Sequence, residues 1–420
     1  MTFRFVHTAD IHLDSPLQSL SLRDPEIAEL IGIAMRQSFS RTVDLCLDER
    51  VDALMIAGDL YDRELRSMKS GAFFSQEMRR LDAAGIRVFI IKGNHDAESV
   101  VTKRLALPEN VHVFTGRAEA VPIEGRDVVV HGVSFAQAHI ADSLLPKYKP
   151  PLPGNVNIGL LHTSLSGSAA HDVYAPCGLV DLTGHGFDYW ALGHIHQRQI
   201  HASGPATVVM AGIPQGRHIN EGGAKSVSLV EILEDGTIRV HERFTGIAQF
   251  ERVAVDVAGV EDWSQILRRI ETALGEAADA AKAGHLVARL EILGRTPLAM
   301  RLRRDLDVLI EEARQSAGAR DRIFVEAVDL HTHAPEQARS IDGDDPLTEL
   351  RLLMGREAGN REVLKDAARL LIEDLQQKLP PELRDRFGDS EARLAELAES
   401  FIEEGGETLL ARFEADRTGA

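Results

Sequence analysis

The stretch from Val88 to Asp96 reads VFIIKGNHD, and it decides the fold that we expect for the N-terminal part of the chain. Its four consecutive apolar residues predict a strand that is buried on both faces, as in a sheet covered by other layers. Gly93 allows a sharp turn after this strand, and Asn94 and His95 then present an amide and an imidazole. Because Gly-Asn and Asn-His are also ordinary turn dipeptides, this stretch alone leaves a plain turn and a functional site equally open.

Strands and helices alternate at the start of the chain, and helices become scarce after residue 110. The expected elements are a strand at 3–8, a helix at 26–50, a strand at 51–57, a helix at 66–84, a strand at 86–91, and further strands at 111–114, 128–135, 156–161, 189–192, 207–210, 227–233 and 237–243. This order predicts an α/β domain over residues 1–249, in which two sheets pack together with helices outside. Functional groups of such sheets lie at the carboxyl ends of the strands.

The pattern begins again near residue 250. A strand at 250–257, a helix at 261–282, a strand at 285–293, a helix at 297–316 and a strand at 322–330 predict a second α/β domain over residues 250–343. Residues 344–420 read as a helical tail, with Leu394, Leu397 and Phe401 as an apolar stripe. This stripe is consistent with an internal packing face and also with a docking face for another subunit.

Composition narrows the class of protein. The 420 residues are 44% hydrophobic and carry a formal net charge of −18, which argues against a generally basic coat for nucleic acid. The absence of a long apolar run or a signal peptide leads us to expect a cytoplasmic protein without a membrane span. With only two cysteines, a thiolate zinc site is excluded, so any metal must be held by His, Asp and Asn.

Five polar motifs follow apolar runs and together form a candidate metal site. They are Asp10 with His12, Asp59 in GDLYD, Asn94 in GNHD, His162 in GLLHTS, and His194 with His196 in ALGHIHQ. Residues i and i+2 of a strand point to the same side, so we expect Asp10 with His12, and His194 with His196, to act as pairs. The motifs can then converge on one patch at the edge of the sheets.

The number of ligands suits two metal ions. Asp10, His12, Asp59 and His196 would form one shell, while Asp59, Asn94, His162 and His194 would form a second shell that shares Asp59. Two ions bridged by one carboxylate match the spacing of about 3.5–4 Å used for displacement at phosphorus. Two divalent ions with only two carboxylates leave the site positive, which suits a singly charged phosphodiester and gives a reason for the neutral Asn94. Mixed His, Asp and Asn ligation favours Mn or Fe over Mg.

These motifs resemble the calcineurin-like metallophosphoesterase superfamily. The stretches TADIHLD, GDLYD and PQGRHINEGG (residues 214–223) are similar to its DNA-repair exonuclease branch, the SbcD and YhaO type, over about residues 3–245. The resemblance implies a four-layer α-β-β-α sandwich metallophosphoesterase fold, with the α/β domain as a cap and the helical tail behind it. It also implies that the seven residues of the two shells are the metal ligands.

The same resemblance suggests roles for other residues. His95 would protonate the leaving sugar oxygen, and Asp96 and Asp62 would orient imidazoles. Some nuclease relatives have a His in place of Asp62, so a direct substrate role of this position is in doubt. Arg217 and His218 match a loop near the site and would bind the nucleic-acid backbone. We expect the remaining histidines, including His331 and His333 in the cap, to be structural.

The sequence therefore predicts a metal-dependent DNA nuclease, with 3′ to 5′ exonuclease and endonuclease capacity in DNA repair. The resemblance implies two Mn²⁺ ions, a homodimer, and an ABC-type ATPase partner of the SbcC or YhaN kind that docks partly on the tail. A phosphomonoesterase or cyclic-nucleotide phosphodiesterase with the same metals is the alternative. A third class, a non-catalytic adaptor, is disfavoured by the complete ligand set.

Overall fold

The structure is a computed structural model. It describes residues 2–15, 17, 20, 24–62, 68–98, 107–165, 174–201, 204, 206–318, 321–335, 358–378 and short pieces between 394 and 409. The chain divides into two compact units, Met1–Glu251 with Ala281–Leu286, and Arg252–Ala280 with Val287–Ala420. We describe each unit by itself, and the division into regions 1–249, 250–343 and 344–420 stays a prediction.

The first sheet has six strands in the order β12-β11-β1-β2-β3-β4. Their bounds are β1 (Phe3–Thr8), β2 (Ala53–Ala57), β3 (Arg87–Ile91), β4 (Val111–Val113), β11 (Ser226–Ile232) and β12 (Ile238–Phe244). The strands β1, β2 and β3 are parallel because α2 (Pro25–Asp48) and α3 (Met68–Ala83) return the chain to the same edge each time. Asp24 caps α2 by accepting the Ile27 backbone N–H at 3.1 Å, and proline follows at the first helical position.

The second sheet also has six strands, in the order β5-β6-β7-β8-β10-β9. Their bounds are β5 (Glu119–Pro122), β6 (Val128–Gly132), β7 (Val156–His162), β8 (Tyr189–Gly193), β9 (Gln199–His201) and β10 (Thr207–Met210). The two edge strands β5 and β9 were not expected from the sequence. They are short, and their side chains are mostly half-buried, so they lack the apolar pattern that marks a strand.

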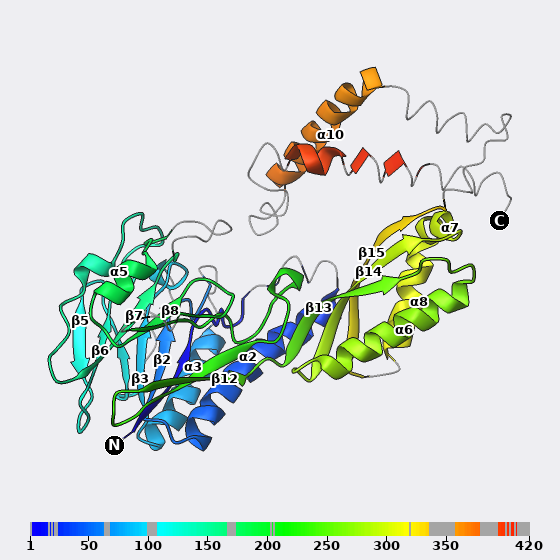
Figure 1. The fold of residues 1–420 in the computed structure, drawn as a ribbon. Coiled ribbons are helices and arrows are strands. Elements are labelled where there is room, and N and C mark those ends of the chain that lie inside the picture. The colour runs from blue at the N-terminus through cyan, green and yellow to red at the C-terminus, as the bar shows by residue number, and fades with distance from the viewer. Residues whose placement is uncertain are drawn as a thin grey trace, which may run out of the picture. The chain divides into compact units, whose positions relative to one another are not determined.

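The strand β3 shows how the layers are held together. Val88 and Ile90 pack with apolar side chains of α2 and α3, whereas Phe89 and Ile91 pack between the two sheets. All four side chains are buried, as the uninterrupted apolar run predicted. Figure 1 shows α2 and α3 beside the strands of the first sheet and the short helix α5 (Leu179–Gly184) beside β7 and β8 of the second.

The predicted four-layer α-β-β-α sandwich is confirmed, with one qualification about its last layer. The outer face of the second sheet is covered by α5 and by loop residues such as Tyr148, which pack with Trp190 and Leu192. Among the described residues α5 has only six residues, so loops provide much of this layer. Both sheets place the carboxyl ends of their parallel strands at the candidate site.

The third sheet has the order β13-β14-β15. Its strands are β13 (Ala248–Asp256), β14 (His285–Arg295) and β15 (Ile323–His333), and its helices are α6 (Trp263–Ala280), α7 (Ala299–Arg304) and α8 (Leu306–Gly318). The prediction of a single helix at 297–316 is wrong, because the helix is interrupted at Asp305. The backbone angles of Asp305, φ −104° and ψ 32°, lie outside the helical region. Asp305 directly precedes α8, and aspartate is favoured at the position before a helix.

The described part of the tail is helical, as expected. Its longest element is α10 (Ala358–Lys378), and Lys365 of this helix lies 3.3 Å from the Glu399 carboxylate. Ile372 and Ala398 are buried. No described helix is both long and apolar enough to cross a membrane.

Candidate metal centre

The predicted ligands lie at strand ends or in the loops that follow them, and His162 is the last residue of β7. Several have unusual backbone conformations. Asp10, His12, Asp59 and His194 have positive φ angles of 50°, 46°, 52° and 104°. Such angles are uncommon for residues other than glycine and cost free energy unless the surrounding structure enforces them. We expected these residues to act in pairs because residues i and i+2 of a strand point to the same side. This reason is wrong, because β1 ends at Thr8 and β8 ends at Gly193, before the paired residues begin. Loop geometry brings these ligands together instead.

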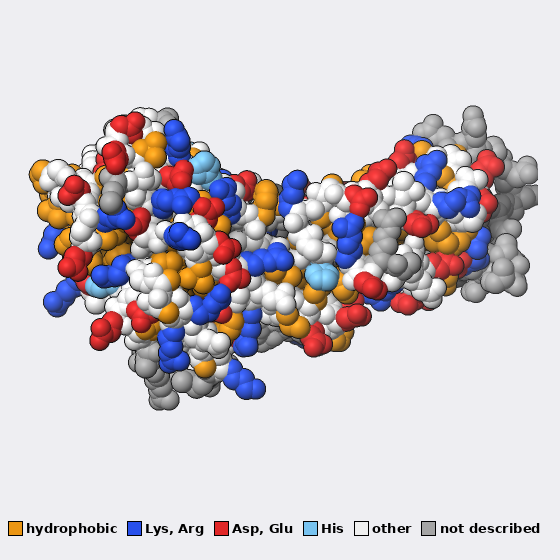
Figure 2. All heavy atoms as spheres, turned by 90° about the horizontal axis from the view of Figure 1, so that it is seen from below, with side chains coloured by type: hydrophobic (Ala, Val, Ile, Leu, Met, Phe, Trp, Pro, Cys, Tyr) orange, Lys and Arg blue, Asp and Glu red, His pale blue; other side chains and the backbone are white. Residues whose placement is uncertain are grey.

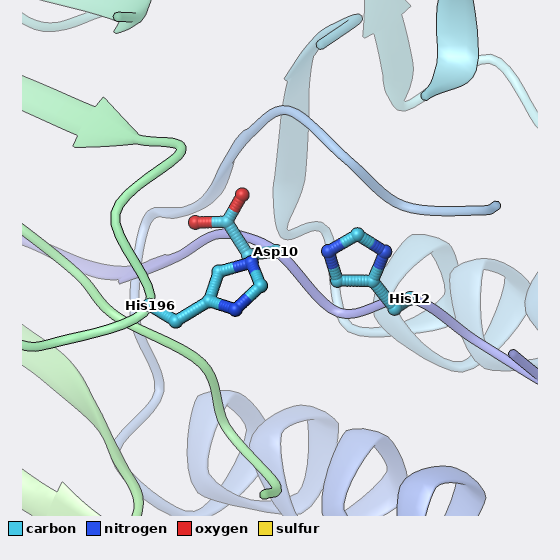
Figure 3. Close-up of side chains that lie close together, drawn as sticks. All are labelled: Asp10, His12 and His196. Atoms are coloured by element: carbon cyan, nitrogen blue, oxygen red, sulfur yellow. The ribbon is translucent and has the colours of Figure 1, made fainter. Parts of the chain in front are cut away.

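One group of ligands consists of Asp10, His12 and His196. Each offers an atom that lies within 4.8 Å of the others. Figure 3 shows the three side chains close together, with His196 on a different segment of the chain from Asp10 and His12. Burial raises the pKa of Asp10 to about 6, against the opposing charges of nearby histidines. The charged form of a carboxyl group at this buried position is stabilised by a cation beside it.

His12 has one nitrogen engaged and one open. Its Nδ1 lies 2.7 Å from Asp62 Oδ1, which fixes the tautomer, as expected for Asp62. Its Nε2 is buried, and no described residue provides it with a hydrogen-bond partner. Burial lowers the pKa of His12 to about 4, so the ring is neutral and its open nitrogen carries a lone pair. This is the state in which an imidazole binds a metal ion.

A second group consists of Asp10, Asp59 and His162. His162 Nδ1 donates to the Ala57 carbonyl at 3.0 Å, and its Nε2 lies 3.0 Å from Asn94 Oδ1 and 3.4 Å from Asp59 Oδ2. Burial alone would lower the pKa of His162, but the charges of Asp59 and Asp10 raise it to about 9. The buried oxygens thus attract a positive charge, and a metal ion can supply it in place of that proton.

His194 and His196 serve different parts of the site. The His194 ring lies 5.2 Å from the His162 ring, while its backbone N–H donates to Asp10 Oδ2 at 2.9 Å. Asp10 belongs to both of the groups given above, and a third group of His12, Asp62 and His95 shares His12 with the first. The assignment of Asp59 as the ligand shared by two ions stays a prediction.

Two glycines let the loops approach the ligands closely. A Cβ at Gly93 would lie 2.2 Å from Asp59 Oδ1 and 2.8 Å from His162 Cε1, and a Cβ at Gly58 would lie 2.4 Å from His162 Nδ1. Side chains at these positions would occupy the space of the ligands themselves. Gly93 is therefore needed for room, in addition to the turn that the sequence suggested.

We expected Asp96 to orient an imidazole, but its carboxylate accepts hydrogen bonds from backbone N–H groups instead. Its Oδ1 accepts the Tyr61 backbone N–H at 2.9 Å, and its Oδ2 accepts those of Leu60 at 3.0 Å and Gly93 at 3.2 Å. Burial raises the pKa of Asp96 to about 7, and the charge of Asp59 acts in the same direction. Asp96 thus ties the loop after β2 to the loop after β3, and a direct catalytic role for it stays a prediction.

His95 is more accessible than His12, His162 and His196. Its side chain is 38% exposed, its Nδ1 lies 3.0 Å from Asp62 Oδ1, and its backbone N–H donates to Asp59 Oδ1 at 2.9 Å. Burial would lower the pKa of His95, but the hydrogen bond to Asp62 and the charge of Asp59 raise it above its usual value. One carboxylate, Asp62, therefore orients both His12 and His95.

Glu221 was missed by the sequence analysis. Its Oε1 lies 2.7 Å from His196 Nδ1, and both of its oxygens accept hydrogen bonds from Arg217. His218 Nε2 lies 3.6 Å from the same Oε1. Glu221 lies within the PQGRHINEGG stretch, but its role was not predicted because it is far from His196 along the chain. The substrate-binding roles of Arg217 and His218 stay predictions.

Several other histidines have structural partners. His7 is buried against the Tyr189 hydroxyl at 3.0 Å, and burial lowers its pKa to about 3. His131 Nε2 lies 2.9 Å from Asn157 Oδ1. His241 Nε2 lies 3.2 Å from Glu231 Oε2. His171 lies outside the described residues.

The described donor set fits divalent metal ions. It combines imidazole nitrogens, two buried carboxylates and an amide oxygen, which suits ions of intermediate hardness. The open and buried Nε2 of His12 is the clearest sign, since an unpartnered polar atom in a protein interior costs free energy.

Comparison with known proteins gives two family matches. Residues 3–198 match the calcineurin-like phosphoesterase family, and residues 250–333 match the middle domain of the metallophosphoesterase YhaO. The uncharacterized metallophosphoesterase YhaO of Bacillus subtilis is 34% identical over 300 residues, which cover 70% of this chain and 72% of that protein.

More distant relatives carry the name DNA double-strand break repair protein Mre11. Those of Methanopyrus kandleri and Sulfurisphaera tokodaii are 24% and 26% identical over 63% and 50% of this chain. The chain spans only 62% and 54% of their lengths. Among solved structures, a dimetal phosphatase from Danio rerio is similar with a TM-score of 0.39 and 14% identity, covering 58% of this chain and 96% of the other.

Proposed function

This chain belongs to the calcineurin-like metallophosphoesterase family, with a YhaO-type middle domain, and we propose that it is a metal-dependent DNA nuclease. Phosphoesterases of this family use a dimetal centre, and the chain has residues that can hold one. The proposed reaction is hydrolysis of DNA phosphodiester bonds in cytoplasmic DNA repair, with 3′ to 5′ exonuclease and endonuclease capacity and with Mn²⁺ as the metal.

One observation carries the proposal, namely the state of His12. Its Nδ1 is engaged by Asp62, and its buried Nε2 faces the Asp10 and His196 group without a hydrogen-bond partner among the described residues. Asp10, His12, Asp59 and His196 would hold one ion, and Asp59, Asn94, His162 and His194 the other. Ions held there would supply Lewis-acid activation at a phosphoester and would stabilise its developing negative charge.

His95 and Asp62 supply the proton transfer. The Asp62 carboxylate holds His95 Nδ1, so that Nε2 is the nitrogen left to face a substrate in the open part of the site. A protonated His95 can give this proton to the leaving sugar oxygen, which would otherwise depart as an alkoxide. Its backbone N–H, which bonds to Asp59, fixes the distance between the acid and the proposed metal ligands.

The choice of DNA rests on the Mre11 relatives and on the extra α/β domain, which suits a long substrate. Surface charge adds no separate support. On the face drawn in Figure 2, Lys and Arg side chains of the described residues are intermingled with Asp and Glu. Specific binding would then depend on the positive charge of the metal-loaded site and on local contacts, such as the one proposed for His218.

The proposal extends to partners. A homodimer and an ABC-type ATPase of the SbcC or YhaN kind would complete the assembly, with the tail as one docking surface. In support, α10 exposes five large apolar side chains, namely Val363, Leu364, Leu370, Leu371 and Leu375. Exposed apolar side chains on one helix favour packing against another helix.

One preparation can separate the functional classes. The full chain with Mn²⁺ is given labelled linear duplex, labelled single strand and nitrophenyl phosphate, in parallel with the His95→Gln variant. Nucleotide release from DNA alone supports the nuclease. Hydrolysis of the small ester alone would replace it with a phosphomonoesterase, and a wild-type protein without any activity would favour an adaptor.

A further inference from the structure

The loop at residues 214–223 places a buried carboxylate directly behind a proposed metal ligand. The Glu221 side chain is 6% exposed, and its Oε1 lies 2.7 Å from Nδ1 of His196. This arrangement repeats the one at His12, whose Nδ1 is engaged by Asp62. In both cases the carboxylate comes from a different loop than the histidine that it contacts.

We propose that Glu221 and Arg217 form a positioning pair that holds His196 in the tautomer required for metal binding, and that Arg217 is not a phosphate-binding residue. The inference rests on the proposed two-metal function. A carboxylate at Nδ1 places the proton there and leaves Nε2 of His196 with a lone pair for the ion. The structure thus assigns to Glu221 the task at His196 that Asp62 performs at His12.

The contacts of Arg217 explain why it is not available to the substrate. Its Nη2 donates to Glu221 Oε1 at 2.7 Å, while its Nε and its backbone N–H reach Oε2 at 3.2 and 2.8 Å. The Nε and Nη2 edge is the fork with which arginine clasps a carboxylate or a phosphate in two-point fashion. Here a carboxylate already occupies that fork, and the side chain is only 15% exposed.

The Glu221–Arg217 pair also leaves the net charge of the site unchanged. An uncompensated carboxylate behind His196 would reduce the positive charge that a metal-loaded site needs for a phosphodiester. Arg217 offsets the charge of Glu221, so His196 is oriented while the net charge of the site is unchanged. Four hydrogen bonds from His196 and Arg217 also satisfy the buried carboxylate completely.

The loop is rigid enough to act as a support. Gln215 accepts the backbone N–H groups of Ile247 and Ala248 at 2.8 and 3.2 Å and donates to the Ala248 carbonyl at 2.7 Å. The Pro214 carbonyl accepts the Ser38 hydroxyl of α2 at 2.8 Å. These contacts tie the loop to β13 and α2, so Glu221 stays at a fixed distance from His196.

The first test is Glu221→Gln in the full chain. Glutamine can accept only at its one oxygen, so its amide N–H groups would face donors of Arg217 or His196 in a buried place. We expect Mn²⁺ titrated into the metal-free protein to bind about 10–100-fold more weakly. The matched control is Glu231→Gln, which removes a carboxylate from His241 outside the site and should leave Mn²⁺ affinity unchanged.

A second measurement needs no mutation of the pair. Histidine ¹⁵N spectra of the metal-free wild type should show His196 protonated at Nδ1, with its signal assigned through His196→Gln. Glu221→Gln should turn this signal into a mixture of tautomers. A wild-type His196 that carries its proton on Nε2, or unchanged Mn²⁺ affinity in Glu221→Gln, would overturn the proposal.

Arg217→Gln distinguishes positioning from substrate binding. Loss of a phosphate contact would lower the slope of log K against log salt for duplex binding in EDTA by about 0.9. We expect that slope to stay the same and Mn²⁺ affinity to fall, because Glu221 loses the two hydrogen bonds that the Arg217 side chain donates. A lower slope with unchanged Mn²⁺ affinity would show instead that Arg217 binds the DNA phosphate. None of these readouts requires DNA cleavage, so a failure of the nuclease proposal would be seen separately.

Discussion

Gly93→Ala is the sharpest test of the way the strand end is packed against the site. The ideal Cβ would lie 2.2 Å from Asp59 Oδ1 and 2.8 Å from His162 Cε1. A carbon needs about 3.5 Å from such neighbours, so the Asp59 carboxylate must retreat by more than about 1 Å. Both neighbours are buried, and neither can swing into solvent.

The size of the effect follows from two losses. Overpacking of a buried site costs about 1–3 kcal/mol. Displacement of Asp59 also breaks its 2.9 Å hydrogen bond from the His95 backbone, and bonds to charged groups contribute about 1.5–3 kcal/mol. We therefore expect the free energy of unfolding to fall by about 3–5 kcal/mol and Tm to fall on the order of 10 °C.

The assay is thermal unfolding of the metal-free protein, followed by titration with Mn²⁺. Because Asp59 and His162 both move, Mn²⁺ affinity should fall by more than the roughly 100-fold limit typical of residues that only orient a ligand. The control is Gly32→Ala in α2, where no atom lies within 4 Å of an added Cβ. That change should stabilise the helix by about 0.5–1 kcal/mol. If Gly93→Ala unfolds at the wild-type temperature and binds Mn²⁺ normally, the packing described for the turn is incorrect.

Three further outcomes are expected. Asp59→Asn should abolish binding of both ions in a Mn²⁺ titration, because the proposed shared ligand loses its charge, and retention of two ions would refute the sharing. His95→Gln should keep the metal content measured by elemental analysis while it slows DNA cleavage by about 10²–10⁴-fold, whereas loss of metal would make His95 a ligand. Adding Mn²⁺ at about 100 times its Kd should stabilise the metal-free protein by about 2.7 kcal/mol for each site that is filled, as seen in thermal unfolding, and an unchanged Tm would contradict a buried metal site.

Much of the fold could be predicted because its strands are buried on both faces. The run from Val88 to Ile91 became β3 with its side chains shared between two cores, as uninterrupted apolar residues indicate. The edge strands β5 and β9 were not predicted, since half-buried segments of three or four residues carry no clear period. The break at Asp305 was missed for a similar reason, because one capping residue leaves the helical pattern on both sides intact.

The sequence singled out residues that the structure brings close together, but the way in which they meet could not be predicted. Asp10 and His12 converge through positive φ angles after β1, and strand alternation plays no part. These conformations are set by tertiary contacts such as the bond from the Asp10 backbone N–H to the Gly58 carbonyl at 3.0 Å. Nothing in the local sequence specifies them, since aspartate and histidine adopt such angles only where the fold holds them there.

Three histidines of the site are oriented in the same way, by an acceptor at Nδ1. Nδ1 of His12 faces Asp62, Nδ1 of His196 faces Glu221, and Nδ1 of His162 donates to the Ala57 carbonyl. In each case an acceptor behind the ring leaves Nε2 as the nitrogen that can bind an ion. The acceptors differ in charge: the His196 pair includes Arg217 as a counterion, and His162 uses a neutral carbonyl. At His196 and His162, orientation of the ring therefore adds no net negative charge to that of Asp10 and Asp59. For this reason the neutral Asn94 and the buried Arg217 serve the same end, a centre that stays positive toward a phosphodiester.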